Sequence, residues 1–374
     1  MGPTDRDLVL LRQALALAEQ AIGRSDPNPR VGCVIAGEGW TAHGCTQAAG
    51  GAHAEIVALR AARDAGHDPR GATVYVSLEP CAHHGRTPPC CDALVDAGVA
   101  RVVAATRDPN PLVAGQGFAR LRRAGIAVDL AEGEVAREAR ELNIGFFSRM
   151  HRGRPWVRMK IAASLDGRTA LDNGLSQWIT GEAARADGHR WRKRASALLT
   201  GIGTVLEDNP RLDVRLVPTE RQPLRVIVDS RLQTPSDARI LDAPGEVQVY
   251  AAVADAAREA ALRARGARVT RLPDARHKVD LAAMLDDLAR QGTNELHVEA
   301  GHKLNASLLR AGLVDELLVY LAPRLLGLGR EMAAFGPLQS LAEGLSFDFT
   351  QVERIGADLR ILARPPGRAD FLDN

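Results

Sequence analysis

The chain has few aromatic residues, almost no net charge and no long apolar run. Phe, Trp and Tyr make up 4% of its 374 residues, so few side chains could stack on single-stranded bases. The 48 basic and 46 acidic side chains leave a formal net charge of +2, which argues against nucleic acid as the main partner. No apolar run reaches the roughly 18 residues that would predict a membrane span.

A secretory signal is also missing, since residues 1–7 carry acidic side chains and lack the signal-peptide pattern. The five cysteines are an odd number, and three of them cluster as Cys81, Cys90 and Cys91. In a chain without an export signal, such a cluster indicates metal binding rather than disulfide bonds. We therefore expect a reducing, cytoplasmic location.

Strand and helix patterns alternate along the chain, which predicts an α/β fold, and the length favours two domains. The first half predicts a helix capped by Thr4 and ended by Gly23, further helices at 53–65, 91–97 and 118–123, and strands at 31–35, 73–77 and 102–105. The second half predicts strands at 156–161, 197–200, 224–228, 247–251, 296–298 and 316–321, and helices near 182–194, 254–265, 279–291 and 304–311. The basic stretch 148–155 contains Gly and Pro and is the predicted linker between domains at 1–147 and 154–370.

Three short pieces of the first half fit one zinc site: His53-Ala54-Glu55, Glu79-Pro80-Cys81 and Thr87-Pro88-Pro89-Cys90. The imidazole of His53 and the thiolates of Cys81 and Cys90 would leave the fourth position of a tetrahedral Zn²⁺ open for water. Zinc lowers the pKa of such a water, and Glu55 would move its proton to a departing amine. This donor set, with Glu as acid/base rather than ligand, predicts hydrolytic deamination.

The local structure around these ligands can also be predicted. We place His53 and Glu55 in the first turn of a helix. Thr87 would be the N-cap of the next helix and Pro88 its first residue, so that the positive helix end favours the Cys90 thiolate. The eight residues between the cysteines exceed the two of many zinc deaminases. Alternatives stay open: Cys91 could replace Cys90, and His83 and His84 could be ligands, although lining the pocket is favoured for them. Cys33 is expected in the core, and Cys45 has no assigned role.

The string at 79–90, EPCAHHGRTPPC, closely resembles the bifunctional riboflavin-biosynthesis deaminase–reductase family, as do the two Asp-Pro-Asn-Pro strings at 26–29 and 108–111. The second half resembles the family's reductase domain through 160–170, 176–180, 203–215, 298–301 and 314–316. The resemblance implies an N-terminal cytidine-deaminase-like three-layer domain followed by a dihydrofolate-reductase-like α/β domain.

Two sequential reactions are implied by the same resemblance. Zinc-dependent hydrolysis would remove the 2-amino group of 2,5-diamino-6-(5-phosphoribosylamino)pyrimidin-4-one, and NADPH would then reduce the ribosyl side chain to ribityl. The implied cofactors are Zn²⁺ and NADPH, and the implied partner is a small phosphorylated pyrimidine, with no nucleic acid and no membrane. We further expect a homo-oligomer, either a dimer or a tetramer.

The residues alone predict no dinucleotide site, because no G-x-G-x-x-G follows a strand. By resemblance, the NADPH contacts are Ala162, Trp178, Thr204, Asp208, Ser230, Gly301, His302, Lys303, Leu304, Asn305, Ala306 and Ser307. By the same resemblance, the substrate contacts are Ser176, Arg192, Leu212, Arg215 and Glu299. Lys160 faces either the substrate or solvent. The guanidinium groups of Arg192 and Arg215 suit bidentate binding of a phosphate.

Two competing interpretations remain at this point. The chain could be a nucleic-acid or nucleobase deaminase with an appended binding domain, which tight, salt-sensitive RNA binding would support. Alternatively, the zinc could be structural and the chain a binding module. Glu55→Gln separates these readings, because only a catalytic site would lose deamination while it keeps zinc.

Overall fold

The computed structural model describes residues 2–83, 88–111 and 113–373. The chain folds as two compact units, one formed by the residues up to Gly153 together with those from Phe371 onward, the other by Arg154–Asp370. Both units are α/β, as the alternating pattern predicted. No helix of the described chain has the length and apolar character needed to cross a membrane.

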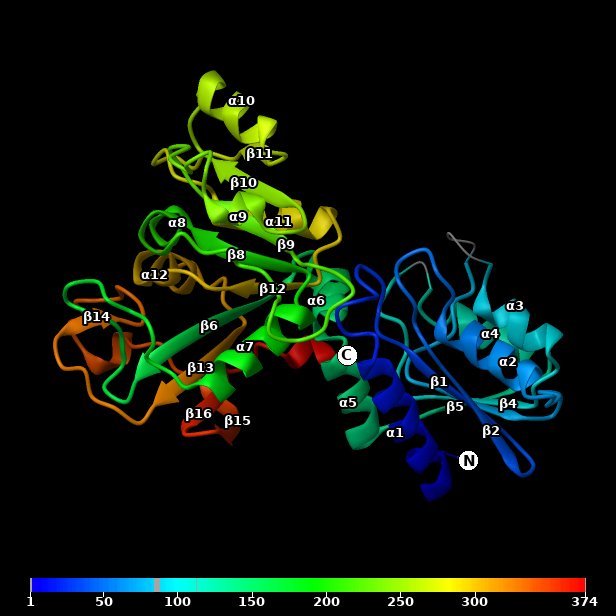
Figure 1. The fold of residues 1–374 in the computed structure, drawn as a ribbon. Helices are drawn as coiled ribbons and strands as arrows, with labels where there is room; N and C mark the ends of the chain where they lie inside the picture. Colours follow the sequence, from blue (N-terminus) through cyan, green and yellow to red (C-terminus); the bar gives the residue numbers. More distant parts are fainter. Residues whose placement is uncertain (1, 84–87, 112, 374) are drawn as a thin grey trace. The chain divides into compact units, whose positions relative to one another are not determined.

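The first unit is built on one mixed sheet in the order β2-β1-β3-β4-β5 (Figure 1). Its strands are β1 (Gly32–Gly37), β2 (Trp40–Cys45), β3 (Thr73–Val76), β4 (Arg101–Ala104) and β5 (Ala127–Leu130). Strand β1 runs antiparallel to both β2 and β3, whereas β3, β4 and β5 are parallel. Its helices are α1 (Asp5–Glu19), α2 (Ala54–Asp64), α3 (Cys90–Asp96), α4 (Gln116–Arg123), α5 (Gly133–Leu142) and α6 (Ile144–Arg152).

Helices cover both faces of this sheet. Helix α1 begins with the predicted Thr4 cap, whose hydroxyl accepts from the Asp7 N–H while the Asp7 carboxylate accepts from the Thr4 N–H. Apolar side chains of α1 and α5 pack with Val34, Tyr75 and Val103 on one face. Helix α2 crosses β2 so closely that a Cβ on Gly44 would lie 2.2 Å from the Ala54 carbonyl oxygen. Only glycine therefore lets α2 sit where it does.

The prediction of a linker at 148–155 is wrong over most of its length, because residues 148–152 belong to helix α6. The helix ends at Gly153, which has a left-handed conformation. Basic residues in the last turn of α6 concealed an amphipathic helix whose first five residues are all buried. Only residues 153–155 connect α6 to the next strand.

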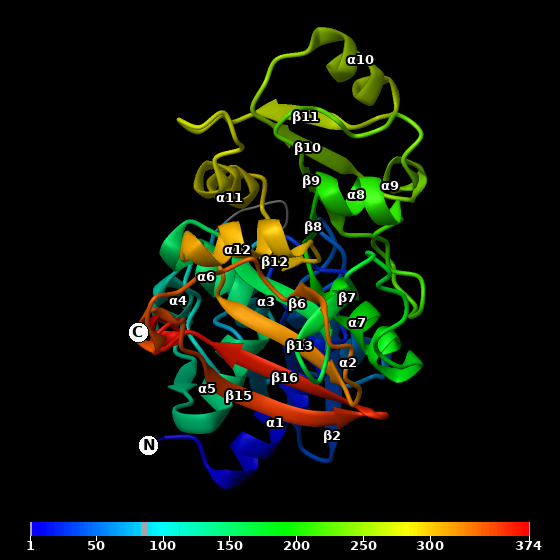
Figure 2. The same cartoon turned by 90° about the vertical axis from the view of Figure 1, so that its left-hand side faces the viewer.

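The second unit has a nine-stranded sheet in the order β11-β10-β9-β8-β12-β6-β13-β16-β15 (Figure 2). These strands are β6 (Trp156–Ser164), β8 (Ala197–Gly201), β9 (Leu224–Val228), β10 (Val247–Ala251), β11 (Arg268–Arg271), β12 (Glu295–Val298), β13 (Glu316–Ala322), β15 (Asp348–Ile355) and β16 (Asp358–Arg364). The strands from β11 to β13 pair in parallel, and β16 and β15 close the sheet as an antiparallel hairpin. A separate ribbon pairs β7 (Arg168–Leu171) with β14 (Gly329–Glu331).

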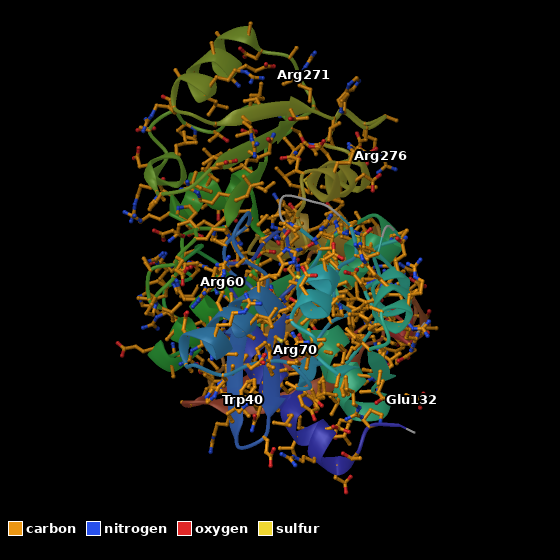
Figure 3. All side chains as sticks on the ribbon, turned by 90° about the vertical axis from the view of Figure 1, so that its right-hand side faces the viewer. Trp40, Arg60, Arg70, Glu132, Arg271 and Arg276 are labelled. Atoms are coloured by element: carbon orange, nitrogen blue, oxygen red, sulfur yellow. The ribbon has the colours of Figure 1, made fainter. Side chains whose placement is uncertain are left out.

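Two apolar clusters fix the layers of the second unit. One packs α11 (Leu281–Arg290) and α12 (His302–Arg310) against one sheet face through residues such as Met284, Leu288 and Leu308. The opposite face carries a second cluster with Val205, Ile240 and Leu262. These three side chains belong to α8 (Ile202–Asp208), α9 (Arg239–Asp242) and α10 (Ala256–Ala264). Helix α7 (Glu182–Arg194) covers the sheet near β13 and β16. Charged side chains such as Arg60, Arg70 and Arg276 point outward from the units that carry them (Figure 3).

Candidate active sites

Three potential ligand atoms converge in the first unit, two of them from helix starts and one from the loop after a strand. His53 is the N-cap of α2, Cys81 follows β3, and Cys90 is the first residue of α3. Nδ1 of His53 lies 3.5 Å from Sγ of Cys81 and 3.3 Å from Sγ of Cys90, and all three atoms lie within 4.8 Å of one another.

This donor set fits a zinc ion. Tetrahedral zinc with Zn–S near 2.3 Å and Zn–N near 2.05 Å requires a sulfur–nitrogen separation of about 3.5 Å. The observed separations of 3.3 and 3.5 Å match that value. Hydrogen bonds with Cys90 and His53 lower the pKa of Cys81 to about 4. The same contact with Cys81 raises the pKa of Cys90. A cation between the sulfurs would favour both as thiolates.

Glu55 lies beside this site in the first turn of α2 and is only 4% exposed. Burial raises the pKa of Glu55 to about 7, and the negative charge of Cys81 adds to the effect. A carboxyl group with a pKa near neutrality can both accept and donate a proton. Glu55 therefore has the properties of a general acid/base next to the metal ligands.

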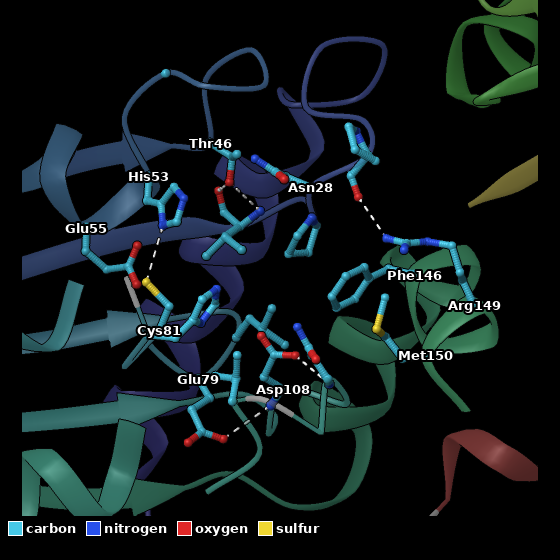
Figure 4. A pocket seen from close by; sticks show the side chains of 18 of the residues that line it. Asn28, Thr46, His53, Glu55, Glu79, Cys81, Asp108, Phe146, Arg149 and Met150 are labelled. Atoms are coloured by element: carbon cyan, nitrogen blue, oxygen red, sulfur yellow. Dashed lines mark hydrogen bonds between the residues drawn. The ribbon is translucent and has the colours of Figure 1, made fainter. Parts of the chain in front are cut away.

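A cavity of about 380 Å³ opens in front of these residues. His53, Glu55 and Cys81 lie on one side of it, and Phe146, Arg149 and Met150 from α6 on the other (Figure 4). The remaining lining includes Asn28, Thr46, Glu79, His83, Asp108 and Asn110. The candidate metal ligands and Glu55 thus lie at one end of a space large enough for a small heterocycle.

Two buried carboxyl groups, those of Glu79 and Asp108, belong to the lining of this cavity. Glu79 accepts hydrogen bonds from the backbone N–H groups of Asp108, Gly115 and Phe118, so it holds the loop that carries Asp108. Burial raises the pKa of Asp108 to about 7.

The second unit has its own cavity, of about 480 Å³, at the ends of β6 and β12 and the start of α12. Its lining combines cationic side chains with three carboxylates: Lys160, Arg185, Arg192, Arg211, Arg215, Arg239 and Arg330, with Glu207, Asp208 and Glu299. The excess of cations favours a ligand that carries several negative charges.

Glu299 is the centre of this cavity's charge network. Its carboxylate receives a bidentate contact from Arg192, including Nη2 to Oε2 at 2.9 Å, and lies 3.7 Å from Nζ of Lys160. Burial alone would raise the pKa of Glu299, but Arg192 and Lys160 outweigh it and hold the pKa well below its usual range. Glu299 is therefore a fixed anion that orients two cations toward the cavity.

Comparisons with known proteins decide the family. Residues 4–106 match the family described as the cytidine and deoxycytidylate deaminase zinc-binding region, and residues 155–361 match the RibD C-terminal domain. The chain is 44% identical to the riboflavin biosynthesis protein RibD of Escherichia coli, over 95% of this chain and 98% of that protein. The chain belongs to the RibD family.

Solved structures of RibD proteins agree with this assignment. Acinetobacter baumannii RibD superposes with a TM-score of 0.86 at 40% identity, covering 96% of this chain and 99% of that one. A Thermotoga maritima protein described as a diaminohydroxyphosphoribosylaminopyrimidine deaminase and 5-amino-6-(5-phosphoribosylamino)uracil reductase superposes with a TM-score of 0.83 at 33% identity, covering 96% and 98%.

In the deaminase half of this RibD-family chain, some local expectations need correction. Pro89 rather than Thr87 occupies the N-cap position of α3, so Pro88 precedes the helix instead of being its first residue. Thr87 and His84 lie outside the described residues. Cys91 turns away from the ligand cluster and donates to the carbonyl oxygens of Pro80 and Gly117, so the geometry selects Cys90.

The other expectations for this half concern Cys33, His83 and Cys45. Cys33 is fully buried in the core, as predicted. His83 is exposed and lines the cavity. Cys45 lies half-buried at the end of β2.

The reductase cavity brings together most of the residues carried over from the family. Its lining contains Lys160, Ala162, Ser176, Trp178, Arg192, Thr204, Asp208, Leu212, Arg215, Glu299, Gly301, His302 and Asn305. It does not contain the other five, Ser230, Lys303, Leu304, Ala306 and Ser307. Of these, Ser230 accepts from the Val279 N–H, and Ala306 is completely buried inside α12.

Several polar groups that line the two cavities received no role from sequence reasoning, among them Glu79, Asp108, Arg149 and Arg211. Asp213, which accepts from Arg211, also received none. Asp108 could have been found, since it opens the second Asp-Pro-Asn-Pro string. Glu79 accepts a hydrogen bond from a residue far along the chain, and Asp213 accepts one from Arg211 within an irregular segment. No sequence pattern predicts either contact.

Proposed function

We propose that this chain is a bifunctional enzyme of riboflavin biosynthesis that first deaminates and then reduces one phosphorylated pyrimidine. The first reaction hydrolyses the 2-amino group of 2,5-diamino-6-(5-phosphoribosylamino)pyrimidin-4-one and releases ammonia. The second uses NADPH to reduce the ribosyl side chain of the resulting uracil to ribityl. The observation that carries this proposal is the open His–Cys–Cys donor set beside buried Glu55, in a chain that matches the RibD family over nearly its full length.

For deamination, His53, Cys81 and Cys90 would hold a zinc ion, which supplies the Lewis acidity that makes water nucleophilic near neutral pH. Glu55 accepts a proton from the attacking water and returns it to the departing nitrogen, a role that suits a buried carboxyl group beside the candidate metal ligands. Burial of Glu55 keeps bulk water from competing for that proton.

For reduction, NADPH supplies the hydride, and the protein binds and orients both reactants. Lys160 and Arg192 are fixed by Glu299 at the cavity wall, where they can contact the substrate. His302 and Asn305 lie in the first turn of α12 within the same cavity, where backbone N–H groups favour an anion.

The direct test is incubation of the purified protein with the diaminopyrimidine phosphate, with and without NADPH, followed by mass spectrometry. We expect ammonia release without NADPH and a further gain of two hydrogens with it. No turnover of this compound in either arm would refute the proposal.

Glu55→Gln tests the role of the carboxylate. Because Gln keeps the shape but cannot carry a proton, we expect deamination to fall by at least about 100-fold. Zinc content, measured by elemental analysis, should stay at wild-type level, and reduction of the uracil should be unchanged. Loss of zinc together with activity would instead favour a structural role for this region.

We also propose a cytoplasmic homo-oligomer, either a dimer or a tetramer. Five free cysteines suit a reducing compartment. Phe349 and Val352 are 72% and 55% exposed on the edge strand β15, which supports association there. Light scattering of the wild type and of Phe349→Glu would test this, and a wild-type monomer would contradict it.

A further inference from the structure

An irregular segment of the reductase unit, residues 211–215, carries two arginines to the cavity without a helix or strand to support them. The segment is nevertheless tightly held. The Leu212 side chain is 3% exposed and packs in an apolar cluster. The Val214 N–H donates to Oε1 of Gln222 at 2.8 Å, and Nε2 of Gln222 donates to the Val214 carbonyl at 2.9 Å.

One buried carboxylate organises the arginines at this point. Asp213 is 3% exposed, and each of its oxygens accepts from a different guanidinium. Nη1 of Arg215 donates to Oδ1 at 2.7 Å, and Nε of Arg211 donates to Oδ2 at 2.9 Å. The backbone carbonyl of Asp213 also accepts from Nη1 of Arg192 at 2.9 Å. A single residue therefore fixes three guanidinium groups that all line the cavity.

The charges and the remaining donors suit an anion. Arg211 and Arg215 use only one nitrogen each on Asp213, and their side chains are 42% and 46% exposed, so the rest of each guanidinium can reach a ligand. Arg192 is neutralised by Glu299, which leaves two cations against the one charge of Asp213. Burial would raise the pKa of Asp213, but Arg215 and Arg211 lower it, so the carboxylate stays ionised.

We propose that Asp213 is a positioning residue that holds Arg211 and Arg215 as a receptor for a phosphate monoester. This inference rests on the proposed function, which supplies two such groups: the 5′-phosphate of the substrate and the 2′-phosphate of NADPH. Fixing the guanidinium planes before the ligand arrives reduces the entropy lost on binding. Asp213 itself touches neither reactant.

The test compares wild type and Asp213→Asn with two substrates, the aminouracil ribosyl phosphate and its dephosphorylated nucleoside, and with two cofactors, NADPH and NADH. Since Asn cannot accept from both arginines, we expect kcat/KM for the phosphate-bearing reactant to fall at least tenfold, mainly through KM. The reactant without that phosphate should be affected less than twofold. A loss confined to phosphorylated substrate assigns the site to the 5′-phosphate, and a loss confined to NADPH assigns it to the 2′-phosphate.

Asp242→Asn is the matched control, because Asp242 pairs with Arg265 on the surface of the same unit and does not line the cavity. Thermal melts followed by the fluorescence of Trp156, Trp178 and Trp191 report on the integrity of the reductase unit in each variant. If Asp213→Asn does not fold, Arg211→Ala decides, since it should give the same selective loss. Equal losses with and without the phosphate, or no loss, would overturn the inference while leaving the proposed function intact. A wild-type protein that does not reduce the substrate would instead refute the proposed function.

Discussion

Replacing Glu316 by Gln should destabilise the reductase unit strongly. Glu316 and Glu295 are each 1% exposed, and the almost fully buried Arg158 bridges them, with Nη1 2.7 Å from Oε2 of Glu295. Arg194 and Arg364 complete the group, each with its Nε 2.9 Å from one of the carboxylates. The cluster thus contains three cations and two anions, and Glu316→Gln leaves three cations with one anion.

Loss of one partner from a buried ion pair costs about 3–5 kcal/mol. For a unit of this size, each kcal/mol lowers Tm by roughly 2–4 °C, so we expect a decrease of about 6–20 °C. Arg158→Met should cost less, because it leaves two neutral Arg–Glu pairs. As a control, Glu246→Gln removes a surface pair with Arg268, whose side chains are 74% and 52% exposed, and should cost at most about 1 kcal/mol.

Thermal melts followed by tryptophan fluorescence suit this test, because Trp156, Trp178 and Trp191 belong to the reductase unit and only Trp40 to the other.

Burial would raise the pKa of Glu316, but Arg158 and Arg364 lower it. The stability that Glu316 contributes is therefore present above its unfolded pKa of about 4.3 and is lost as the pH falls through the lower folded value. A Tm change below about 3 °C at pH 7, or a larger effect of Arg158→Met, would refute this reasoning.

Two further predictions concern the sites themselves. Gly44→Ala places a Cβ 2.2 Å from the Ala54 carbonyl oxygen, so it should displace the start of α2. We expect this variant to lose zinc and deamination activity while reduction persists. Full zinc occupancy with normal deamination would contradict this prediction. His189 is buried, and its burial together with Arg192 and Arg215 lowers its pKa to about 4. Between about pH 6.5 and 4 the unfolded state therefore binds one more proton than the folded state. As the pH falls through this window, stability should decrease by about 3 kcal/mol, and His189→Gln should remove that dependence in urea melts.

Local sequence signals predicted most of the architecture. The Thr4 capping box placed α1, and each predicted strand of the second half appears within a few residues of its expected bounds. The hairpin of β15 and β16 was missed because β15 is exposed along nearly its whole length and therefore lacks an apolar pattern. Strand β2 was missed because its Trp40–Cys45 segment contains polar residues and a glycine that accommodates α2.

The convergence of His53, Cys81 and Cys90 could be anticipated because each belongs to a short motif. His53 and Cys90 lie at the starts of helices, and Cys81 lies in the loop after β3. The groups that support the cavities could not be anticipated. Glu79 acts on N–H groups 29 to 39 residues further along the chain, and the role of Asp213 depends on where Leu212 and Gln222 fix an irregular segment. Such roles follow from tertiary contacts rather than from periodicity.

The last residues of the chain return to the first unit after the second unit is complete. The Phe371 ring lies 4.7 Å from the guanidinium carbon of Arg152, and Leu372 is 2% exposed. The reductase unit is therefore an insertion, anchored at its beginning and its end. A protein truncated after residue 153 would lack the packing of Phe371 and Leu372 against the first unit. A variant in which a short linker joins residue 153 to residues 371–373 would restore that packing.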